Sequence, residues 1–162
     1  MAHGTVAVEV DGVIHAYTRG WHDGTIYDDP VPGAFDALRT LMTDYAVYVH
    51  TTRNVSDVES WLCRMDGFVC VAEDLVGNLV TWRWRDKSAT APAAVLEVGA
   101  WPDEPVEFWN HPGRIEFWND RDKILVSNRK LPALAYIDDR GIRFENWDQA
   151  LTEFSRLYGR NA

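Results

Sequence analysis

Four carboxylic acids stand at the ends of short apolar runs, two near each end of the chain. Glu9 and Asp11 close the first apolar run, and Asp138 and Asp139 follow the run 134–137. An ionised carboxylate is costly to bury, so acids at the end of an apolar strand need a reason to be there. If the two runs are strands of one parallel sheet and lie side by side, the four acids converge at the edge where ligands bind.

The chemistry that this set favours is metal-assisted phosphoryl transfer. Acids gathered closely repel one another unless a cation neutralises them. Oxygen-only ligands suit Mg²⁺, which proteins bind through a few carboxylates, water and substrate phosphate. Thr51 follows a second apolar run and could donate a hydrogen bond to phosphate, while Lys130 precedes the last run and could neutralise a transferring group. An acid nucleophile, an acid/base, a cation and hydrogen-bond donors together indicate phosphoryl transfer.

Alternating strands and helices must position these residues. The first strand lies in the stretch 5–14 and ends at Asp11-Gly12, and a loop over 15–29 follows it without helical periodicity. Apolar spacing predicts a helix over 33–44, and Ser56 with Glu59 forms a capping box for a second helix that ends at Gly67. Strands are predicted between them, over 45–50, 68–72, 123–127 and 134–137. This order predicts an α/β fold, a Rossmann-like parallel sheet flanked by helices, in which right-handed crossovers place the first two strands side by side.

A helix is also predicted at the C-terminus, over 147–158, with Asn146 as its N-cap. Its apolar residues fall on one side, which predicts a closing helix that packs on the rest of the fold. These residues are Ala150, Leu151, Phe154 and Leu157.

The middle of the chain, 73–122, has a different character and is expected to be a β-rich, cap-like insertion within the domain. The segment 81–85 alternates as a two-faced antiparallel strand would, and 93–98 could be another strand. The tetrapeptide Glu-Phe-Trp-Asn occurs at 107–110 and again at 116–119, around a Pro-Gly turn signal, which favours a hairpin. Five of the eight tryptophans fall here and favour a small satellite core; an aromatic lid over a substrate, or a homodimer surface, is the alternative.

Length and composition indicate one soluble domain over 1–162. Hydrophobic residues make up 46% and charged residues 25% of the 162 residues, and no apolar run reaches the length of a membrane span. The net charge of −9, without a basic stripe, argues against nucleic acid as a partner but not against a small phosphate ester bound with a metal ion. Cys63 and Cys70 lie in apolar stretches and are expected to be buried thiols, which favours the cytoplasm.

Four short motifs, taken in order, resemble those of the haloacid dehalogenase-like (HAD-like) hydrolase superfamily, and most closely those of its small bacterial and phage members. The motifs are Val-Glu-Val-Asp-Gly-Val-Ile at 8–14, Val-His-Thr-Thr-Arg at 49–53, Arg-Lys-Leu-Pro at 129–132 and Tyr-Ile-Asp-Asp-Arg at 136–140. The match covers roughly residues 5–54 and 123–151. The resemblance implies that Asp11 is the general acid/base and a metal ligand through its backbone carbonyl. Thr51 would bind phosphate, Lys130 would steady nucleophile and phosphate, and Asp138 and Asp139 would hold Mg²⁺.

One position departs from the motif, because Glu9 stands where the family has its nucleophilic aspartate. Glutamate keeps the carboxylate and its metal-binding oxygens but moves them outward by one methylene, and a misplacement of about 1 Å can cost on the order of a hundredfold in rate. The leading hypothesis is therefore a Mg²⁺-dependent phosphohydrolase for a small phosphorylated molecule, with Glu9 as nucleophile and metal ligand. The alternative is a catalytically silent HAD-like domain that binds metal, phosphate or a protein. Thr52, Arg53, His15 and Arg140 are secondary candidates for substrate contact.

Overall fold

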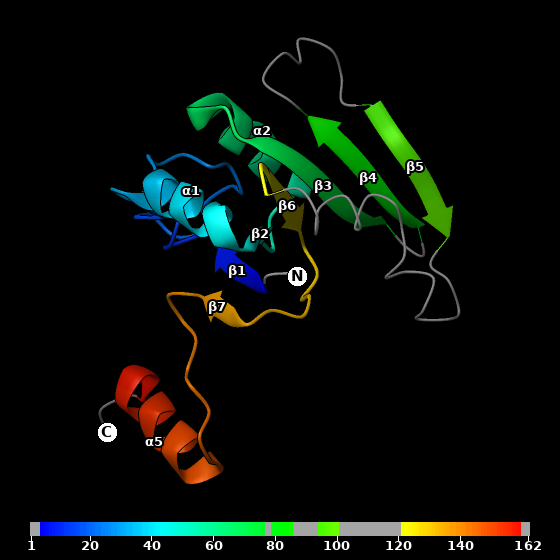
Figure 1. Ribbon diagram of the computed structural model, residues 1–162. Coiled ribbons are helices and arrows are strands. Elements are labelled where there is room, and N and C mark those ends of the chain that lie inside the picture. Colours follow the sequence, from blue (N-terminus) through cyan, green and yellow to red (C-terminus); the bar gives the residue numbers. More distant parts are fainter. Residues whose placement is uncertain (1–3, 77–78, 86–93, 101–120, 160–162) are drawn as a thin grey trace.

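A computed structural model describes residues 4–76, 79–85, 94–100 and 121–159 (Figure 1). Its centre is a seven-stranded sheet with the order β5-β4-β3-β6-β2-β1-β7. The strands span β1 Thr5–Glu9, β2 Ala46–His50, β3 Val69–Val76, β4 Leu79–Arg85, β5 Ala94–Ala100, β6 Lys123–Ser127 and β7 Ala135–Ile137.

Five of these strands, β3, β6, β2, β1 and β7, run parallel to one another. The predicted α/β class and the pairing of the first two strands are confirmed, since β1 and β2 are parallel neighbours. Placing β7 on the other side of β1 leaves β1 between the two strands that carry the other motif residues. The carboxyl ends of β2, β1 and β7 therefore lie side by side at the C-terminal end of the sheet, where open α/β sheets usually bind their ligands.

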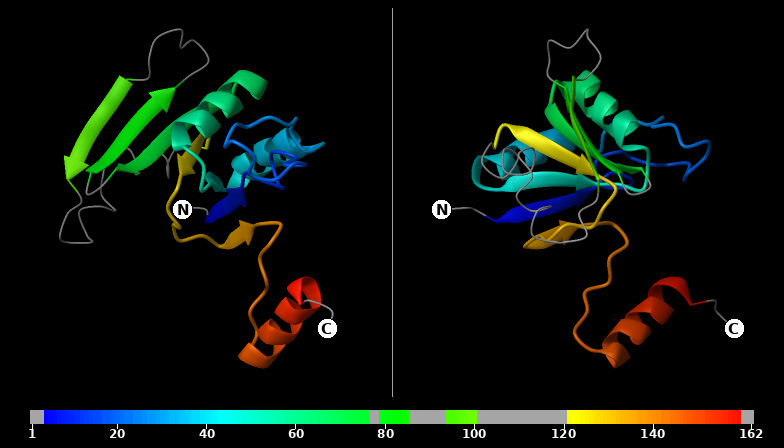
Figure 2. Two further views of the ribbon diagram at one scale, coloured as in Figure 1. Left: turned by 180° about the vertical axis from the view of Figure 1, so that it is seen from behind. Right: turned by 90° about the vertical axis from the view of Figure 1, so that its right-hand side faces the viewer.

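Strands β4 and β5 extend the sheet beyond β3 as antiparallel partners, as the view from behind also shows (Figure 2, left). The predicted strands over 81–85 and 93–98 are thus confirmed in kind, and each begins or ends within two residues of its prediction. Strand β3 is longer than expected because its second half pairs with β4. The hairpin predicted over 107–119 lies outside the described residues, as does most of the tryptophan-rich segment.

Two helices pack on one face of the sheet, α1 Ala34–Asp44 and α2 Val55–Asp66. Gly33, in a left-handed conformation, precedes α1, and Gly67 ends α2 as predicted. The capping-box prediction is wrong: Asn54 is the N-cap of α2, and its side chain accepts a hydrogen bond from the Ser56 amide. Glu59 instead lies buried inside the helix. Among the described residues, the helices are too short and too polar for any of them to cross a lipid bilayer.

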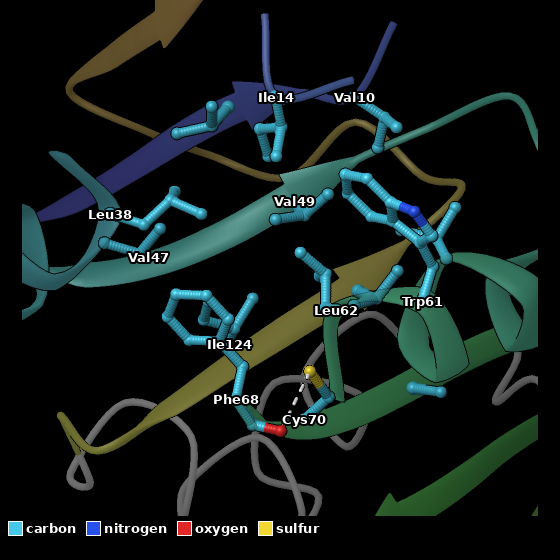
Figure 3. Close-up of a cluster of buried hydrophobic side chains, with 14 of the residues drawn as sticks. Val10, Ile14, Leu38, Val47, Val49, Trp61, Leu62, Phe68, Cys70 and Ile124 are labelled. Carbon is cyan, nitrogen blue, oxygen red and sulfur yellow. Dashed lines mark hydrogen bonds between the residues drawn. The ribbon is translucent and has the colours of Figure 1, made fainter. Parts of the chain in front are cut away.

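The main core lies between this helix pair and the sheet (Figure 3). Alternate residues of β1 point into it, because successive side chains of a strand face opposite sides. Leu38 of α1 and Trp61 and Leu62 of α2 close over them. The buried strand residues in this core are Val6, Val8, Val47, Val49, Cys70, Ala72, Ile124 and Val126. Such burial contributes about 1.5–3 kcal/mol for each large aliphatic or aromatic side chain, which fixes the strands whose ends carry the motif residues.

A second, smaller cluster lies on the opposite face of the sheet. Tyr48, Leu125 and Leu131 are its largest side chains, and Ala7 of β1 belongs to it. Glu9, two residues after Ala7, follows the same alternation and faces this side at the end of its strand. One face of the sheet is thus covered by α1 and α2, and the other face carries the Tyr48 cluster and the side chain of Glu9.

The C-terminal helix, α5 Trp147–Tyr158, forms as predicted, with the Asn146 side chain accepting from the Gln149 amide. Its predicted packing is wrong, because no residue of α5 is buried and the helix stands away from the sheet in all three views (Figures 1 and 2). Strand β7 is also exposed along its length. The apolar face expected to close the fold is therefore open in this structure. Its exposed members are Trp147, Leu151, Phe154, Leu157 and Tyr158.

Candidate functional site

The candidate site lies at the carboxyl ends of three neighbouring parallel strands, β2, β1 and β7. Glu9 and His50 are partners in the register of β1 and β2. On the other side, Val8 pairs with Ile137, so Glu9 and Asp138 come next in the register of β1 and β7. Two of the four acids predicted to converge are therefore adjacent at the end of the sheet.

Glu9 is the least constrained of the motif residues on β1. Its Oε2 lies 4.0 Å from Nδ1 of His50, which is beyond hydrogen-bonding distance, and its side chain is 22% exposed. The Glu9 carboxylate is therefore partly open to solvent, on the side of the sheet that carries Tyr48 and Leu131.

Asp11 is held far more tightly. After Glu9 the chain leaves the strand in a turn in which Gly12 has φ +80° and donates its amide to the carbonyl of His15. Both carboxylate oxygens of Asp11 accept from Nε of Arg53 at 2.9 Å, and Oδ1 also lies 3.0 Å from Nδ1 of His15. Arg53 and His15 are almost fully buried. Asp11 is thus fixed in orientation by two buried side chains.

Arg53 also fastens the loop over 15–29 that follows the first strand. Its Nη1 donates to the carbonyls of Gly24 and Thr25, and its guanidinium lies 4.8 Å from the ring centroid of Trp21. The position of Arg53, predicted as a substrate contact, is beneath this loop. In the described structure it joins the loop to the turn that carries Asp11.

A second set of contacts closes the same loop on itself. Nε2 of His15 accepts from the amide of Asp28 at 3.0 Å. Oδ2 of Asp28 accepts from both the hydroxyl and the amide of Thr18 at 2.6 Å. These hydrogen bonds, the hydroxyl first, lower the pKa of Asp28. His15 is therefore a buried connection between Asp11 and the loop.

Thr51 lies at the end of β2, where its hydroxyl oxygen accepts from the amide of Arg53 at 3.0 Å. Its own amide donates to the carbonyl of Ser127 at 3.1 Å. A hydroxyl that accepts one hydrogen bond still has a proton to donate, so Thr51 remains able to donate to an oxygen of a ligand. Thr52, the next residue, is exposed.

Asp138 and Asp139 follow β7 and approach the turn after β1. Oδ1 of Asp138 accepts from the amide of Arg140 at 2.7 Å, which fixes the turn after the strand. The carboxylate of Asp139 lies so close to Gly12 that a methyl group on that glycine would overlap it. Acids more than a hundred residues apart in the sequence are thus brought into contact with the same turn, as the parallel arrangement predicts.

A cavity of about 520 Å³ opens beside these strand ends. Lys130 and Asp138 both line it, so two residues predicted to act together face the same space. Nζ of Lys130 lies 5.0 Å from the ring centroid of Tyr136. The described residues that line the cavity are His50, Lys130, Tyr136, Asp138, Gly141, Ile142 and Arg143.

A buried tyrosine fixes the loop that carries Lys130. The hydroxyl of Tyr48 donates to the carbonyl of Leu131 at 3.0 Å and accepts from its amide at 3.1 Å. Burial raises the pKa of Tyr48, so the hydroxyl keeps its proton. The sequence offered one signal for this role, since strand alternation places Tyr48 on the same face as Glu9.

The acids of the site are compatible with a Mg²⁺ ion by the chemistry of their donors. All of them offer oxygen, and Mg²⁺ in proteins is usually held through one or two carboxylates with waters and substrate phosphates rather than by an all-protein cage. Among residues 4–76 and 121–159, no three acid, histidine or cysteine side chains are gathered into a ready-made metal cluster. Glu9 and Asp138, adjacent in register, match the two-carboxylate arrangement.

Several residues of the site were not singled out from the sequence. Arg143 and Ile142 line the cavity but belong to none of the motifs, and they follow β7 in a segment without periodicity. His50 belongs to the second motif but is not among the predicted site residues, although it borders both Glu9 and the cavity. Arg140, a predicted substrate contact, is exposed, and its Nε lies 3.9 Å from Asp139.

Comparisons of the chain with protein-family models, curated proteins and solved structures return no match. The candidate site is therefore described from the residues and geometry of this chain alone. It consists of acids at the ends of two neighbouring strands, a hydroxyl at the end of a third, and a lysine. Asp138 and Lys130 line the cavity, and His50, which also lines it, lies 4.0 Å from Glu9.

Proposed function

We propose that the protein is a Mg²⁺-dependent phosphohydrolase of the HAD-like type that acts on a small phosphorylated molecule. The observation that carries this proposal is the meeting of the acids of β1 and β7 beside the cavity that Lys130 lines. The resemblance of the four motifs supports it, because each motif falls at the strand end that the chemistry requires. The cavity volume lies within the usual range for small-molecule sites, about 300–1,000 Å³.

The residues suited to hold Mg²⁺ are Glu9, Asp138, Asp139 and the backbone carbonyl of Asp11. When bound there, the ion would neutralise charge on the acids and on the phosphate of the substrate. Lys130 contributes a second, fixed cation at the cavity wall.

The protein's own groups suggest a two-step reaction. A carboxylate oxygen of Glu9 forms a bond to phosphorus while the bond from phosphorus to the leaving oxygen breaks, Asp11 gives a proton to that oxygen, and an acyl-phosphate on Glu9 results. Thr51 and Lys130 stabilise charge on the phosphoryl oxygens during the transfer. Water then attacks the acyl-phosphate and releases inorganic phosphate, and Asp11 accepts the proton of that water. Asp11 is oriented for this role by the hydrogen bonds from Arg53.

The extra methylene of Glu9 is the feature most expected to limit the rate. An aryl phosphate is the suitable first substrate, because its leaving group departs without a proton from Asp11. We expect turnover that requires Mg²⁺ and is abolished in Asp11→Asn. Glu9→Asp tests the nucleophile, since it shortens the side chain without removing the carboxylate, and Glu9→Gln removes the nucleophile and should give no turnover. Turnover that persists in Glu9→Gln would refute Glu9 as the nucleophile.

A silent HAD-like domain is the second candidate, and one observation favours it. Both oxygens of Asp11 already accept from Arg53, so proton exchange with a substrate requires that contact to loosen. This candidate predicts that the protein binds a phosphate mimic without turning over any phosphate ester. Absence of activity in the unaltered protein, together with activity in Glu9→Asp, would favour it over the phosphohydrolase.

A further inference from the structure

The charges around the cavity are unlike those of the chain as a whole. The protein carries a net charge of −9. Among the described residues that line the cavity, Lys130 and Arg143 are cationic and Asp138 is acidic. The two cations attract anionic ligands to the cavity, beside the acids of the proposed Mg²⁺ site.

The cavity is also larger than one phosphate group needs. At about 520 Å³ it has room for a small organic molecule. Tyr136 and Ile142 supply apolar surface between its charged walls. A ligand that fills the space is therefore expected to have a short carbon skeleton as well as its charged groups.

The two cations of the cavity come from different parts of the chain. Lys130 lies on the loop before β7, which Tyr48 fixes, and belongs to the proposed phosphate site. Arg143 lies beyond β7 and the Asp138–Asp139 pair, and no hydrogen bond or ion pair is recorded for it among the described residues. An arginine presents a planar fork of donors that matches a carboxylate or a phosphate.

From this arrangement we infer that the substrate is a small phosphate ester bearing a second anionic group, and that Arg143 binds that second anion. This inference rests on the proposed function for the assignment of the phosphate to the Lys130 side of the cavity. Arg143 would then be a specificity-determining residue: it sets which phosphate esters are accepted, and it takes no part in the transfer itself.

Three non-hydrolysable ligands test the inference by calorimetry at constant free Mg²⁺. Methylphosphonate carries one anionic group, phosphonoacetate adds a carboxylate, and methylenediphosphonate adds a second phosphonate. We expect at least one of the latter two to bind the unaltered protein tenfold or more tightly than methylphosphonate. The one that binds more tightly identifies the second anion.

Variants locate the effect at Arg143. Arg143→Gln is expected to remove the preference for the second anion, so that the affinity for methylphosphonate falls less than the affinities for the other two ligands, and Arg143→Lys is expected to retain part of the preference. Arg156→Gln is the matched control, because it removes the same charge from an exposed position on α5 that does not line the cavity. Arg143 is exposed, so its variants should keep the thermal unfolding midpoint of the unaltered protein.

The inference is overturned if neither ligand with two anionic groups binds more tightly than methylphosphonate. It is also overturned if Arg143→Gln keeps the preference for the second anionic group, or if Arg156→Gln loses that preference equally. Its failure is distinguishable from failure of the proposed function. A preference for the second anion that depends on Arg143, in a protein without turnover, would refute the phosphohydrolase and leave Arg143 as the residue that binds a second anion of a bound phosphate compound. Turnover of aryl phosphate without any preference for a second anion would support the phosphohydrolase and refute the inference about Arg143.

Discussion

Replacing Gly12 by alanine is the sharpest test of the contact between the turn after β1 and the acids after β7. Gly12 has φ +80°, a left-handed conformation that costs an L-residue about 1–2 kcal/mol. A Cβ added there would also lie 2.8 Å from Cγ of Asp139. Ordinary contact begins at 3.4 Å, so Cγ of Asp139 would have to withdraw by about 0.6 Å, the difference between 3.4 and 2.8 Å, and Oδ2, which lies closer still, by more.

Gly33 provides a matched control for the backbone cost. It has φ +81°, and a Cβ built on it meets nothing within 4 Å. Gly12→Ala and Gly33→Ala should therefore both lower the free energy of unfolding by about 1–2 kcal/mol, measured in urea. Only Gly12→Ala moves Asp139.

The difference in Mg²⁺ affinity between Gly12→Ala and Gly33→Ala measures the effect of moving Asp139. A misplacement of about 1 Å can cost on the order of a hundredfold in rate, so a shift of somewhat more than half that distance predicts a loss of about tenfold. We expect this loss in Mg²⁺ affinity, measured by calorimetry, and in turnover if the protein is an enzyme. Equal Mg²⁺ affinity in Gly12→Ala and Gly33→Ala would refute the placement of Asp139 among the metal ligands.

Three further predictions concern the supports of the site. Arg53→Gln removes a buried guanidinium from its carboxylate partner, so the free energy of unfolding in urea should fall by about 3–5 kcal/mol; a loss below 1 kcal/mol would contradict the role given to Arg53. Tyr48→Phe removes the acceptor of the buried Leu131 amide, while the Leu131 carbonyl keeps the hydrogen bond from the Tyr136 hydroxyl, and should cost about 1–3 kcal/mol in the same measurement, whereas an unchanged midpoint would argue against that support. Hydrogen bonds from Thr18 lower the pKa of Asp28, so their stabilisation of the loop is present above the ordinary value of 3.8 and is lost as pH falls below it. Amide exchange at Thr18, corrected for its intrinsic rate, should then accelerate; constant protection down to pH 2 would contradict the assignment.

Much of the fold follows from local patterns in the sequence. Strand β6 and helix α5 have the predicted bounds, because an isolated apolar run and a 3.6-residue period with a capping asparagine are strong signals. The start of α2 was misplaced because Asn54 and Ser56 are both good caps, and only the backbone geometry selects between them. Glu59, the third residue after Ser56, is buried and does not close a capping box.

Other features depend on contacts that no local pattern contains. The apolar period of α5 identifies which side of the helix is apolar but not what packs against it, and in the described part of the chain no side chain of α5 is buried. Arg143 borders the cavity only because the chain turns after β7, so its spacing from the motif gives no indication. Burial of Arg53 beneath the loop over 15–29 depends on the conformation of that loop, in which Tyr17 and His22 adopt positive φ angles.

The contrast between Glu9 and Asp11 bears on whether the proposed role of Glu9 as a nucleophile is compatible with its longer side chain. Asp11 is bound by two buried side chains and cannot adjust. Glu9 has only a 4.0 Å approach to His50 and is partly exposed, so a change in its length can be absorbed by its own torsions without disturbing the core. The substitution therefore falls at the one motif position of β1 where the surroundings are loose. If Asp11→Glu, which adds the same methylene at the rigid position, proves no more harmful to stability than Glu9→Asp, this distinction between the two acids is wrong.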